Sequence, residues 1–339
     1  TGFGGSNGNG GTGWGTVYKL APDGTETVLY AFQGGNDGWV PIGGTLRDKS
    51  GNLYGTTAFG GGTGCDGGSG CGTVFKVAPD GTEIILHSFQ GDGIDGFYPW
   101  AGVVADRSGI LYGTTERTVY KLAPDGTLTT LHAFTFGSDG GETVAPLILD
   151  RGGDLYGTTM TGGDTRLCGG AGCGVVFKIA PDGAETVLHT FIGGSDGISP
   201  DDGLARDKAG NLYGTTSSGG TLGFGVVFKL APDGTEMILH SFGGTLDGED
   251  PEAGLVLDAA GNLYGTTPFG GIDCGQFQCG IVFKLAPDGT ERVLHRFKAG
   301  DDGCGPGSAD ALILLKDQLY GTTSGCGAHG DGTVFRIRK

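Results

Sequence analysis

The sequence predicts an all-β fold, a β-propeller of six blades with four antiparallel strands each. Two repeating signatures lead to this prediction. The first, Leu-Tyr-Gly-Thr-Thr, begins at Leu53, Leu111, Leu155, Leu212, Leu263 and Leu319. The second, Ala-Pro-Asp-Gly, begins at Ala21, Ala78, Ala123, Ala180, Ala231 and Ala286. About six tandem repeats of 44–58 residues therefore fill residues 1–339 without a linker, which indicates a single propeller domain.

One repeat, residues 253–297, contains four short apolar segments that we denote strands a, b, c and d. They are expected at 253–258, 263–267, 281–285 and 290–297. The turn between c and d is Pro287-Asp288-Gly289, in which proline presets φ and glycine accepts a positive φ. A glycine-rich loop joins b to c. No window has the 3.6-residue apolar period of a helix.

The strand count exceeds that of six complete blades by one. The order a-b-c-d is complete five times, with a c and a d before it and an a, a b and a c after it. We expect the ring to close by pairing of N- and C-terminal strands, which leaves one c strand surplus, either Trp14–Leu20 or Thr333–Lys339. The alternative is a propeller of seven blades, two of them incomplete, with open strand edges.

The composition excludes several classes of partner. The net charge of −17 and the pI near 4.5 argue against nucleic acid, whose phosphates need lysine and arginine. No run of about 18 apolar residues is present, so no membrane span is expected. The 76 glycines lie between apolar runs and indicate turns rather than disorder.

The eight cysteines predict four disulfides. Three close pairs lie in glycine-rich loops between strands b and c, and the last two cysteines flank the final Leu-Tyr-Gly-Thr-Thr. The expected pairs are Cys65 with Cys71, Cys168 with Cys173, Cys274 with Cys279, and Cys304 with Cys326. This usage predicts an oxidising compartment, outside the cell or at its surface. A zinc site is disfavoured, because the spacings are not Cys-x-x-Cys and no histidine accompanies the pairs.

Other polar residues recur with the repeat and are interpreted as structural. Histidines occupy one register of strand d, at His87, His132, His189, His240 and His295. Spread around a ring, they cannot converge on one metal ion, so we expect packed, hydrogen-bonded strand residues. The lysine of strand c, such as Lys284, and the glutamate that opens strand d, such as Glu291, are expected to form cross-strand ion pairs.

The loops between strands d and a supply the candidates for calcium. Each loop places an aspartate before a glycine, and two loops carry further acids. The candidates are Asp201, Asp202, Asp247, Glu249 and Asp250. Several carboxylates on one loop suit Ca²⁺, but no twelve-residue calcium loop is present and Asx turns explain Asp-Gly equally well. We therefore expect no cofactor and no metal, with calcium as the alternative.

No catalytic constellation is evident, so a non-enzymatic protein is expected. The chain has no Gly-x-Ser-x-Gly elbow and no phosphate-binding Gly-x-x-x-x-Gly-Lys loop. Aromatic residues gather where the repeat is irregular, at Phe97, Tyr98 and Trp100, and Trp39 is expected near the N-terminal closure of the ring. Such residues suit stacking on sugars or contact with a partner protein. Covering of a neighbouring blade explains them equally well.

A family resemblance rests on two segments of the repeat, Gly-Thr-Val-Phe-Lys-Leu-Ala-Pro-Asp-Gly-Thr-Glu and Ala-Gly-Leu-Val-Leu-Asp-Ala-Ala-Gly-Asn-Leu-Tyr-Gly-Thr-Thr. The repeat resembles the GloVer tandem repeat of bacterial surface and secreted proteins described as choice-of-anchor proteins. The resemblance covers essentially residues 1–339. It implies a β-propeller exposed outside the cell and supplies no catalytic residues. More distantly, the repeat is similar to the NHL class of propellers, which includes lyases and lactonases.

These observations predict an extracellular or cell-surface propeller with a structural or interaction role. A strand that does not fit its own ring could complete a sheet of a neighbouring copy and build a filament or array. The candidate assembly strands contain Trp14, Val17, Tyr18, Val334, Phe335 and Ile337. The expected partner is another copy, or else a surface glycan or protein. A carbohydrate-binding propeller is the first alternative, and a propeller lyase or hydrolase is the second.

Overall fold

A computed structural model describes residues 1–2, 13–65, 67–271, 279–307 and 311–339. The chain is all-β, a six-blade β-propeller with four antiparallel strands in each blade, as predicted. The helical segments of the described residues are short 3₁₀ turns, η1 (Gly35–Asp37), η2 (Cys168–Gly170), η3 (Gly194–Asp196) and η4 (Gly300–Asp302). No helix in these ranges is long and apolar enough to cross a membrane.

The strands fall into the four predicted classes. Strands a are β3 (Leu46–Arg47), β7 (Val104–Ala105), β11 (Ile148–Leu149), β15 (Ala205–Arg206), β19 (Val256–Leu257) and β24 (Ile313–Leu315). Strands b are β4 (Leu53–Thr57), β8 (Leu111–Thr114), β12 (Leu155–Thr159), β16 (Leu212–Thr216), β20 (Leu263–Thr267) and β25 (Gln318–Gly325). Strands c are β1 (Thr16–Leu20), β5 (Thr73–Val77), β9 (Thr118–Leu122), β13 (Val175–Ile179), β17 (Val226–Leu230), β21 (Ile281–Leu285) and β26 (Val334–Arg338). Strands d are β2 (Glu26–Ala31), β6 (Glu83–Ser88), β10 (Leu128–Ala133), β14 (Glu185–Thr190), β18 (Glu236–Ser241) and β22 (Glu291–Arg296).

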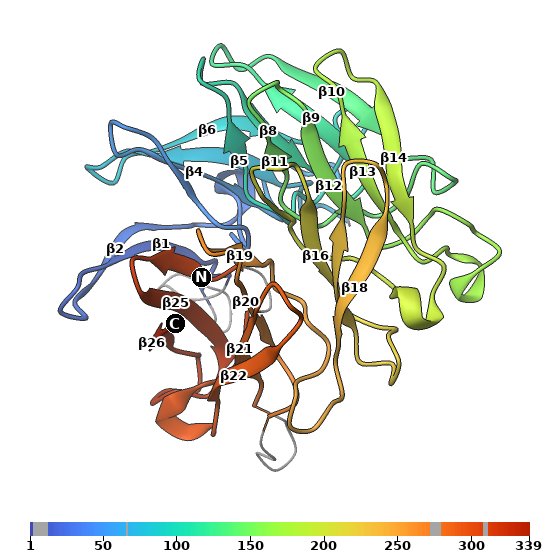
Figure 1. Ribbon diagram of the computed structural model, residues 1–339. Helices are drawn as coiled ribbons and strands as arrows, with labels where there is room; N and C mark the ends of the chain where they lie inside the picture. Colours follow the sequence, from blue (N-terminus) through green and yellow to red (C-terminus); the bar gives the residue numbers. More distant parts are fainter. Residues whose placement is uncertain (3–12, 66, 272–278, 308–310) are drawn as a thin grey trace. The chain divides into compact units, whose positions relative to one another are not determined.

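The sheet β19–β22 shows the register that the repeat uses (Figure 1). Leu263 of β20 lies opposite Leu285 of β21, and Gly265 lies opposite Phe283. The glycine is required by this packing, because a Cβ at Gly265 would lie 2.6 Å from Cζ of Phe283. The glycine of Leu-Tyr-Gly-Thr-Thr therefore leaves room for the aromatic ring of strand c.

The prediction of lysine–glutamate ion pairs between strands c and d is wrong. Lys284 lies opposite Arg292, whereas Glu291 lies opposite Leu285. Successive side chains of a strand point to opposite faces, so Lys284 and Glu291 leave the sheet on opposite sides. Lys284 instead places its ammonium group 5.7 Å from the ring centre of Tyr264, on the strand beside it.

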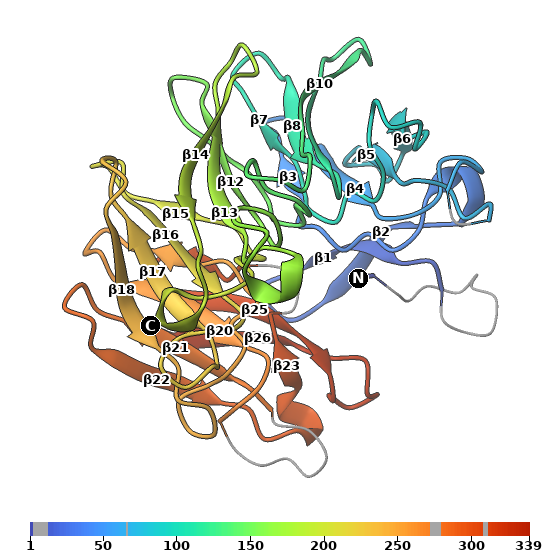
Figure 2. The same cartoon turned by 90° about the vertical axis from the view of Figure 1, so that its right-hand side faces the viewer.

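The chain divides into two compact units. Unit 1 contains residues 1–134, 143–155 and 179–184, and unit 2 contains residues 135–142, 156–178 and 185–339. In unit 1, buried side chains of one sheet pack on those of the next, as in the cluster of Val74, Phe89, Leu111 and Tyr120. In unit 2 the cluster of Val227, Phe242, Leu263 and Phe283 likewise combines buried side chains of two consecutive sheets. Figure 2 shows the strands β16, β17 and β18 of unit 2 side by side. The single-domain organisation stays a prediction.

Closure by pairing of N- and C-terminal strands is not confirmed. Among the described residues, β1 and β2 form a sheet of two strands with each other. In the C-terminal sheet β25 pairs with β24 and with β26, so the c position is filled by the chain's own last strand. A short strand β23 (Cys304–Pro306), which the sequence did not predict, also pairs with β25.

Candidate functional site

The outward face of the C-terminal sheet exposes apolar side chains, beside which Arg336 and Arg338 of β26 lie on the same face. Val334 of β26 is 43% exposed. The valine at the same register of every complete sheet is 0% exposed, namely Val74, Val119, Val176, Val227 and Val282. On the same face, Ile313 lies opposite Tyr320, and Ile313 and Leu315 are both exposed. Elsewhere in the repeat this face is covered by the following sheet, as Val282 is by Leu312 and Leu319.

The N-terminal hairpin of β1 and β2 exposes the face that, in a complete sheet, packs on the preceding sheet. Leu20 of β1 is 41% exposed, whereas its counterparts Val77, Leu122, Ile179, Leu230 and Leu285 are at most 2% exposed. Tyr18 lies opposite Val28 on this face, and Val28 is also exposed. In a complete sheet the corresponding side chains, such as Phe283 and Leu285, pack on the preceding sheet. The other face of the hairpin is covered, because Val17 packs with Phe75 and Val77.

These contacts locate the predicted assembly residues. Trp14, Val17 and Tyr18 belong to or precede the N-terminal hairpin, and Trp14 packs edge-on against Trp39. Phe335 and Ile337 face inward, and Phe335 meets Phe297 edge to face at 5.0 Å. Of these candidates, Val334 lies on the exposed face of the C-terminal sheet and Tyr18 on the exposed face of the hairpin. The exposed residues Ile313, Leu315, Leu20 and Val28 were missed, although each could have been found by comparison with the buried residue at its repeat position.

The calcium candidates separate into three surroundings. Asp247 pairs with His240, with 3.3 Å between Oδ2 and Nε2, and it also accepts a hydrogen bond from the Gly243 amide. Asp202 accepts a hydrogen bond from the Gly203 amide. Glu249 and Asp250 line a surface pocket. Asp201 lies close enough to Asp250 for their charges to interact, and calcium binding by these residues stays a prediction.

The pocket lies in unit 2 and has a volume of about 250 Å³. Two exposed aromatic rings, Phe224 and Phe269, form part of its wall, together with Glu249, Asp250 and the serines 217 and 218. The loops that build it pair through their backbones, because the amide of Asp250 donates to the carbonyl of Phe224 and that of Glu249 donates to Phe269. Sequence reasoning missed both phenylalanines, since loop residues from two repeats meet here.

Acidic groups near this pocket hold protons close to neutral pH. Burial raises the pKa of Asp201 to about 6, and the charge of Asp250 adds to the effect. Burial raises the pKa of Glu252 to about 7, with Asp250 and Asp201 as further causes. A carboxyl group donates a hydrogen bond only while it is protonated, so each of these groups becomes an acceptor alone as the pH rises through its pKa.

The predicted aromatic surface lies in unit 1, and its rings pack on one another. Trp39 stacks on Phe59 at 4.5 Å, and Phe59 contacts both Tyr98 and Trp100. Phe97 meets Tyr98 edge to face. All five side chains are half-buried. The rings therefore cover loops of neighbouring sheets at least in part, which is the structural explanation that the sequence left open.

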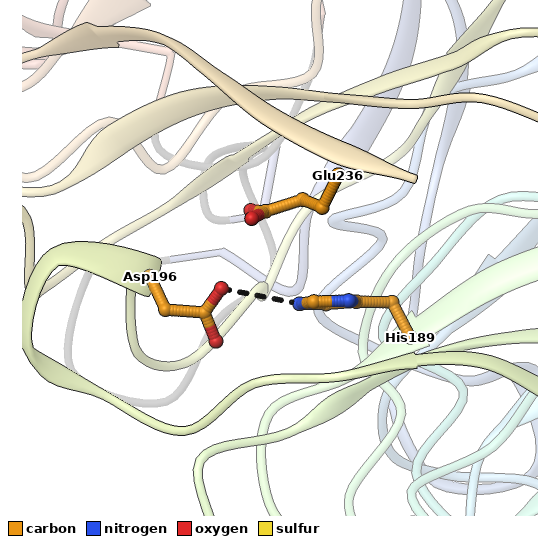
Figure 3. Close-up of side chains that lie close together, drawn as sticks. All are labelled: His189, Asp196 and Glu236. Atoms are coloured by element: carbon orange, nitrogen blue, oxygen red, sulfur yellow. Dashed lines mark ion pairs between the residues drawn. The ribbon is translucent and has the colours of Figure 1, made fainter. Parts of the chain in front are cut away.

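The histidines of strand d have a common partner. Four of them, His87, His189, His240 and His295, pair with the aspartate that precedes a glycine in the following loop, as in His87 with Asp95 at 3.2 Å and His295 with Asp302 at 3.1 Å. Their interpretation as bonded strand residues is confirmed for these two. His189 and Asp196, at 3.3 Å, differ because Glu236 of β18 joins them. Figure 3 shows the three side chains pointing toward one another.

Three of the predicted disulfides are present, Cys65–Cys71, Cys168–Cys173 and Cys304–Cys326. The predicted pair of Cys274 with Cys279 involves a residue outside the described ranges. The three bridges are typical of proteins in an oxidising environment.

The repeat itself identifies the family. Residues 2–168 and 165–339 match the Gloeobacter/Verrucomicrobia repeat. The chain belongs to this family. A search of curated proteins found no match to this member of the Gloeobacter/Verrucomicrobia repeat family. The family assignment confirms the resemblance found in the sequence.

Two solved structures show a similar fold. One is a luciferin-regenerating enzyme, with a TM-score of 0.52, 16% sequence identity, and coverage of 88% of this chain and 91% of the other. The second is a putative 6-phosphogluconolactonase from Bacteroides uniformis, with a TM-score of 0.56, 16% identity, and coverage of 94% and 87%. At this identity the similarity shows the propeller fold alone.

Proposed function

We propose that this member of the Gloeobacter/Verrucomicrobia repeat family is an extracellular or cell-surface interaction propeller that joins to further copies of itself through its terminal sheets. The observation that carries the proposal is the exposure of Val334, a residue whose five counterparts are fully buried. An apolar face of this kind on a soluble protein is typical of an interaction surface.

The exposed face of the C-terminal sheet and the exposed face of the N-terminal hairpin correspond to the two faces that meet between consecutive sheets of the repeat. Consecutive sheets pack with unlike faces. In one such pair, the face that contains Val282 packs on the face of the next sheet that contains Leu319. The C-terminal sheet presents the first kind of face with Val334, and the N-terminal hairpin presents the second kind with Leu20. Contact between them would bury the exposed apolar side chains in the geometry that the interior sheets use.

A second copy fits this contact better than the chain's own hairpin. The C-terminal sheet already contains a c strand, β26, and the hairpin brings another, β1. Six sheets of four strands already supply the blades of a six-blade ring, so within one chain the hairpin β1–β2 would be an incomplete seventh blade. Contact between different copies uses unlike faces, so it repeats in one direction and builds a head-to-tail chain.

Two variants test the direction of assembly. Val334→Lys places a charge on the C-terminal face, and Leu20→Lys places one on the hairpin face. The mass of the purified protein is measured by light scattering over a range of concentrations, with negative-stain images. We expect the parent to form concentration-dependent multimers and each variant alone to be a monomer. An equimolar mixture of the two variants should form dimers and nothing larger, because one intact face of each kind remains.

Controls separate assembly from misfolding. Ile94→Lys changes an exposed isoleucine of unit 1 outside both faces and should leave the multimers unchanged. Deletion of Val334–Lys339 should abolish assembly. A parent protein that is monomeric at all concentrations would overturn the proposal, and so would multimers that both lysine variants retain.

Carbohydrate binding is a second candidate, favoured by the pocket of unit 2. Phe224 and Phe269 supply apolar ring surfaces, and Glu249, Asp250 and the neighbouring serines supply hydrogen-bonding groups. Aromatic rings beside such groups suit a sugar, which has apolar faces and polar edges. A glycan array tests this candidate, with Phe269→Ala expected to abolish binding and Trp100→Ala, in the aromatic cluster of unit 1, expected to preserve it. An array without hits would reject it.

A further inference from the structure

Three side chains with metal-binding atoms converge within unit 2. His189 comes from β14, Asp196 from η3 and Glu236 from β18, so consecutive repeats contribute to the cluster (Figure 3). The imidazole nitrogen and the two carboxylate oxygens all lie within 4.8 Å of one another. His189 Nε2 is 3.3 Å from Asp196 Oδ1. Side chains that converge in this way could hold one small cation.

The cluster has unused hydrogen-bonding capacity. Among the described residues, Glu236 Oε1 is a buried side-chain atom that makes no hydrogen bond, and the equivalent atom of Glu291 is in the same situation. His189 Nε2 lies against Asp196 without a hydrogen bond, whereas His87 and His240 are hydrogen-bonded to their aspartates. A buried polar atom without a hydrogen bond is costly, so a ligand that bound Glu236 Oε1 would stabilise the fold.

Charge balance distinguishes this cluster from two of its repeat counterparts, whereas the junction of His132, Asp139 and Glu185 has the same residue types. At the next junction, His240, Asp247 and Glu291 have a further cation nearby, because the charge of Arg296 acts on both carboxylates. In β18, the strand of Glu236, the position that corresponds to Arg296 of β22 is occupied by Ser241. At the junction of His87 with Asp95 the glutamate is replaced by Leu128. The cluster at His189 thus combines two carboxylates with one imidazole and lacks the arginine.

Burial supports the same conclusion. The side chains of His189 and Asp196 are 17% and 13% exposed. Two carboxylates in such surroundings repel each other unless a proton or a cation lies between them.

We propose that His189, Asp196 and Glu236 bind a divalent transition-metal ion, for which zinc is the reference. Zinc takes imidazole nitrogen and carboxylate oxygen at about 2.0–2.2 Å, and water or a further ligand completes its shell. Calcium and magnesium prefer sites made of oxygen alone, so the imidazole disfavours them. The bound ion would tie β14 and the loop after it to β18, which joins two consecutive repeats without a covalent bond.

Zinc binding by the tag-free protein tests the proposal. The protein is treated with a chelator, dialysed, and titrated with ZnCl₂ in a calorimeter, and retained zinc is measured after a second dialysis. We expect one zinc ion per chain and a rise of about 2 °C or more in the melting temperature. Glu236→Gln keeps the shape of the side chain and removes a charged ligand, so it should weaken binding at least about tenfold.

Matched variants make the outcome decisive. Glu291→Gln alters the equivalent glutamate beside Arg296 and should leave zinc binding unchanged. His189→Asn removes the imidazole and should abolish the melting-temperature rise while circular dichroism confirms the folded state. Absence of stoichiometric zinc in the parent would overturn the proposal, and so would equal binding by the parent and Glu236→Gln.

Discussion

Phe242 and Phe283 meet edge to face across two consecutive sheets, with their ring centres 5.2 Å apart and both side chains fully buried. The contact joins the residue after strand d of one sheet to strand c of the next. It recurs as Phe32 with Phe75, Phe89 with Tyr120, Phe191 with Phe228, and Phe297 with Phe335. The aromatic pair is therefore the repeated element by which one blade packs on another.

Removal of one ring from this contact should destabilise the fold strongly. Phe242→Ala leaves a cavity between two sheets, so we expect the free energy of unfolding to fall by about 3–5 kcal/mol. Urea denaturation followed by circular dichroism measures the change. Met237→Ala, at an exposed position of the same repeat, should alter the free energy by less than about 0.5 kcal/mol. A loss below about 1 kcal/mol for Phe242→Ala would show that the ring pair matters little.

The glycine of Leu-Tyr-Gly-Thr-Thr should tolerate no side chain. A Cβ at Gly265 would lie 2.6 Å from Phe283 and 2.9 Å from Leu255. We expect Gly265→Ala to cost about 1–3 kcal/mol of unfolding free energy, because the ring must move within a packed core. Gly2→Ala is the control, since its nearest neighbour would lie at 3.6 Å. The double variant Gly265→Ala with Phe283→Leu should be less destabilised than the sum of its parts, and strict additivity would contradict the explanation.

Sequence reasoning predicted the strands and turns because their causes are local. Strand c is a run of apolar residues, and the Pro-Asp-Gly turn sets the hairpin to strand d. Disulfides within one loop were predicted for the same reason. The register of the hairpin was not predicted. A shift between Val282 and Phe283 accompanies the pairing in which Lys284 faces Arg292, and a displacement of one residue moves a side chain to the other face.

The candidate sites were harder to predict because they combine residues of different repeats. His189 and Asp196 share one repeat, but Glu236 belongs to the next, and its approach depends on how sheets pack. The same holds for Phe224 and Phe269 in the pocket. The exposure of Val334 is a property of a missing neighbour, which no pattern within the strand records. Long-range packing rather than local propensity therefore decides each of these features.

The stability of unit 1 should depend on the protonation of Glu83. Burial, with the charge of Asp37, raises the pKa of Glu83 from 4.5 to about 7. The folded state thus holds the proton more tightly than the unfolded state, and the stability that protonation provides at low pH is lost as the pH rises from about 4.5 to 7. Glu83→Gln removes this loss. We expect the variant to melt at a higher temperature than the parent at pH 8 and at a similar temperature at pH 4.

Calorimetry at the two pH values checks this prediction, with Glu26→Gln at the exposed equivalent position of β2 as the control. Glu26→Gln should follow the parent at both pH values. An equal difference between Glu83→Gln and the parent at pH 4 and at pH 8 would contradict the proposed origin of the effect.

The disulfides should differ in how much they stabilise the chain. Cys304 and Cys326 are 22 residues apart, whereas Cys65 and Cys71 are 6 apart. The loss of chain entropy in the unfolded state grows with the length of the closed loop, and it amounts to about 3 kcal/mol for the first bridge and about 2 kcal/mol for the second. Replacement of both cysteines of a bridge by serine should therefore lower the free energy of unfolding more at Cys304–Cys326. Urea denaturation of the two double variants measures the order. The same comparison under reducing conditions should abolish the difference if the bridges are its cause, and a difference that persists would assign it to the serines themselves.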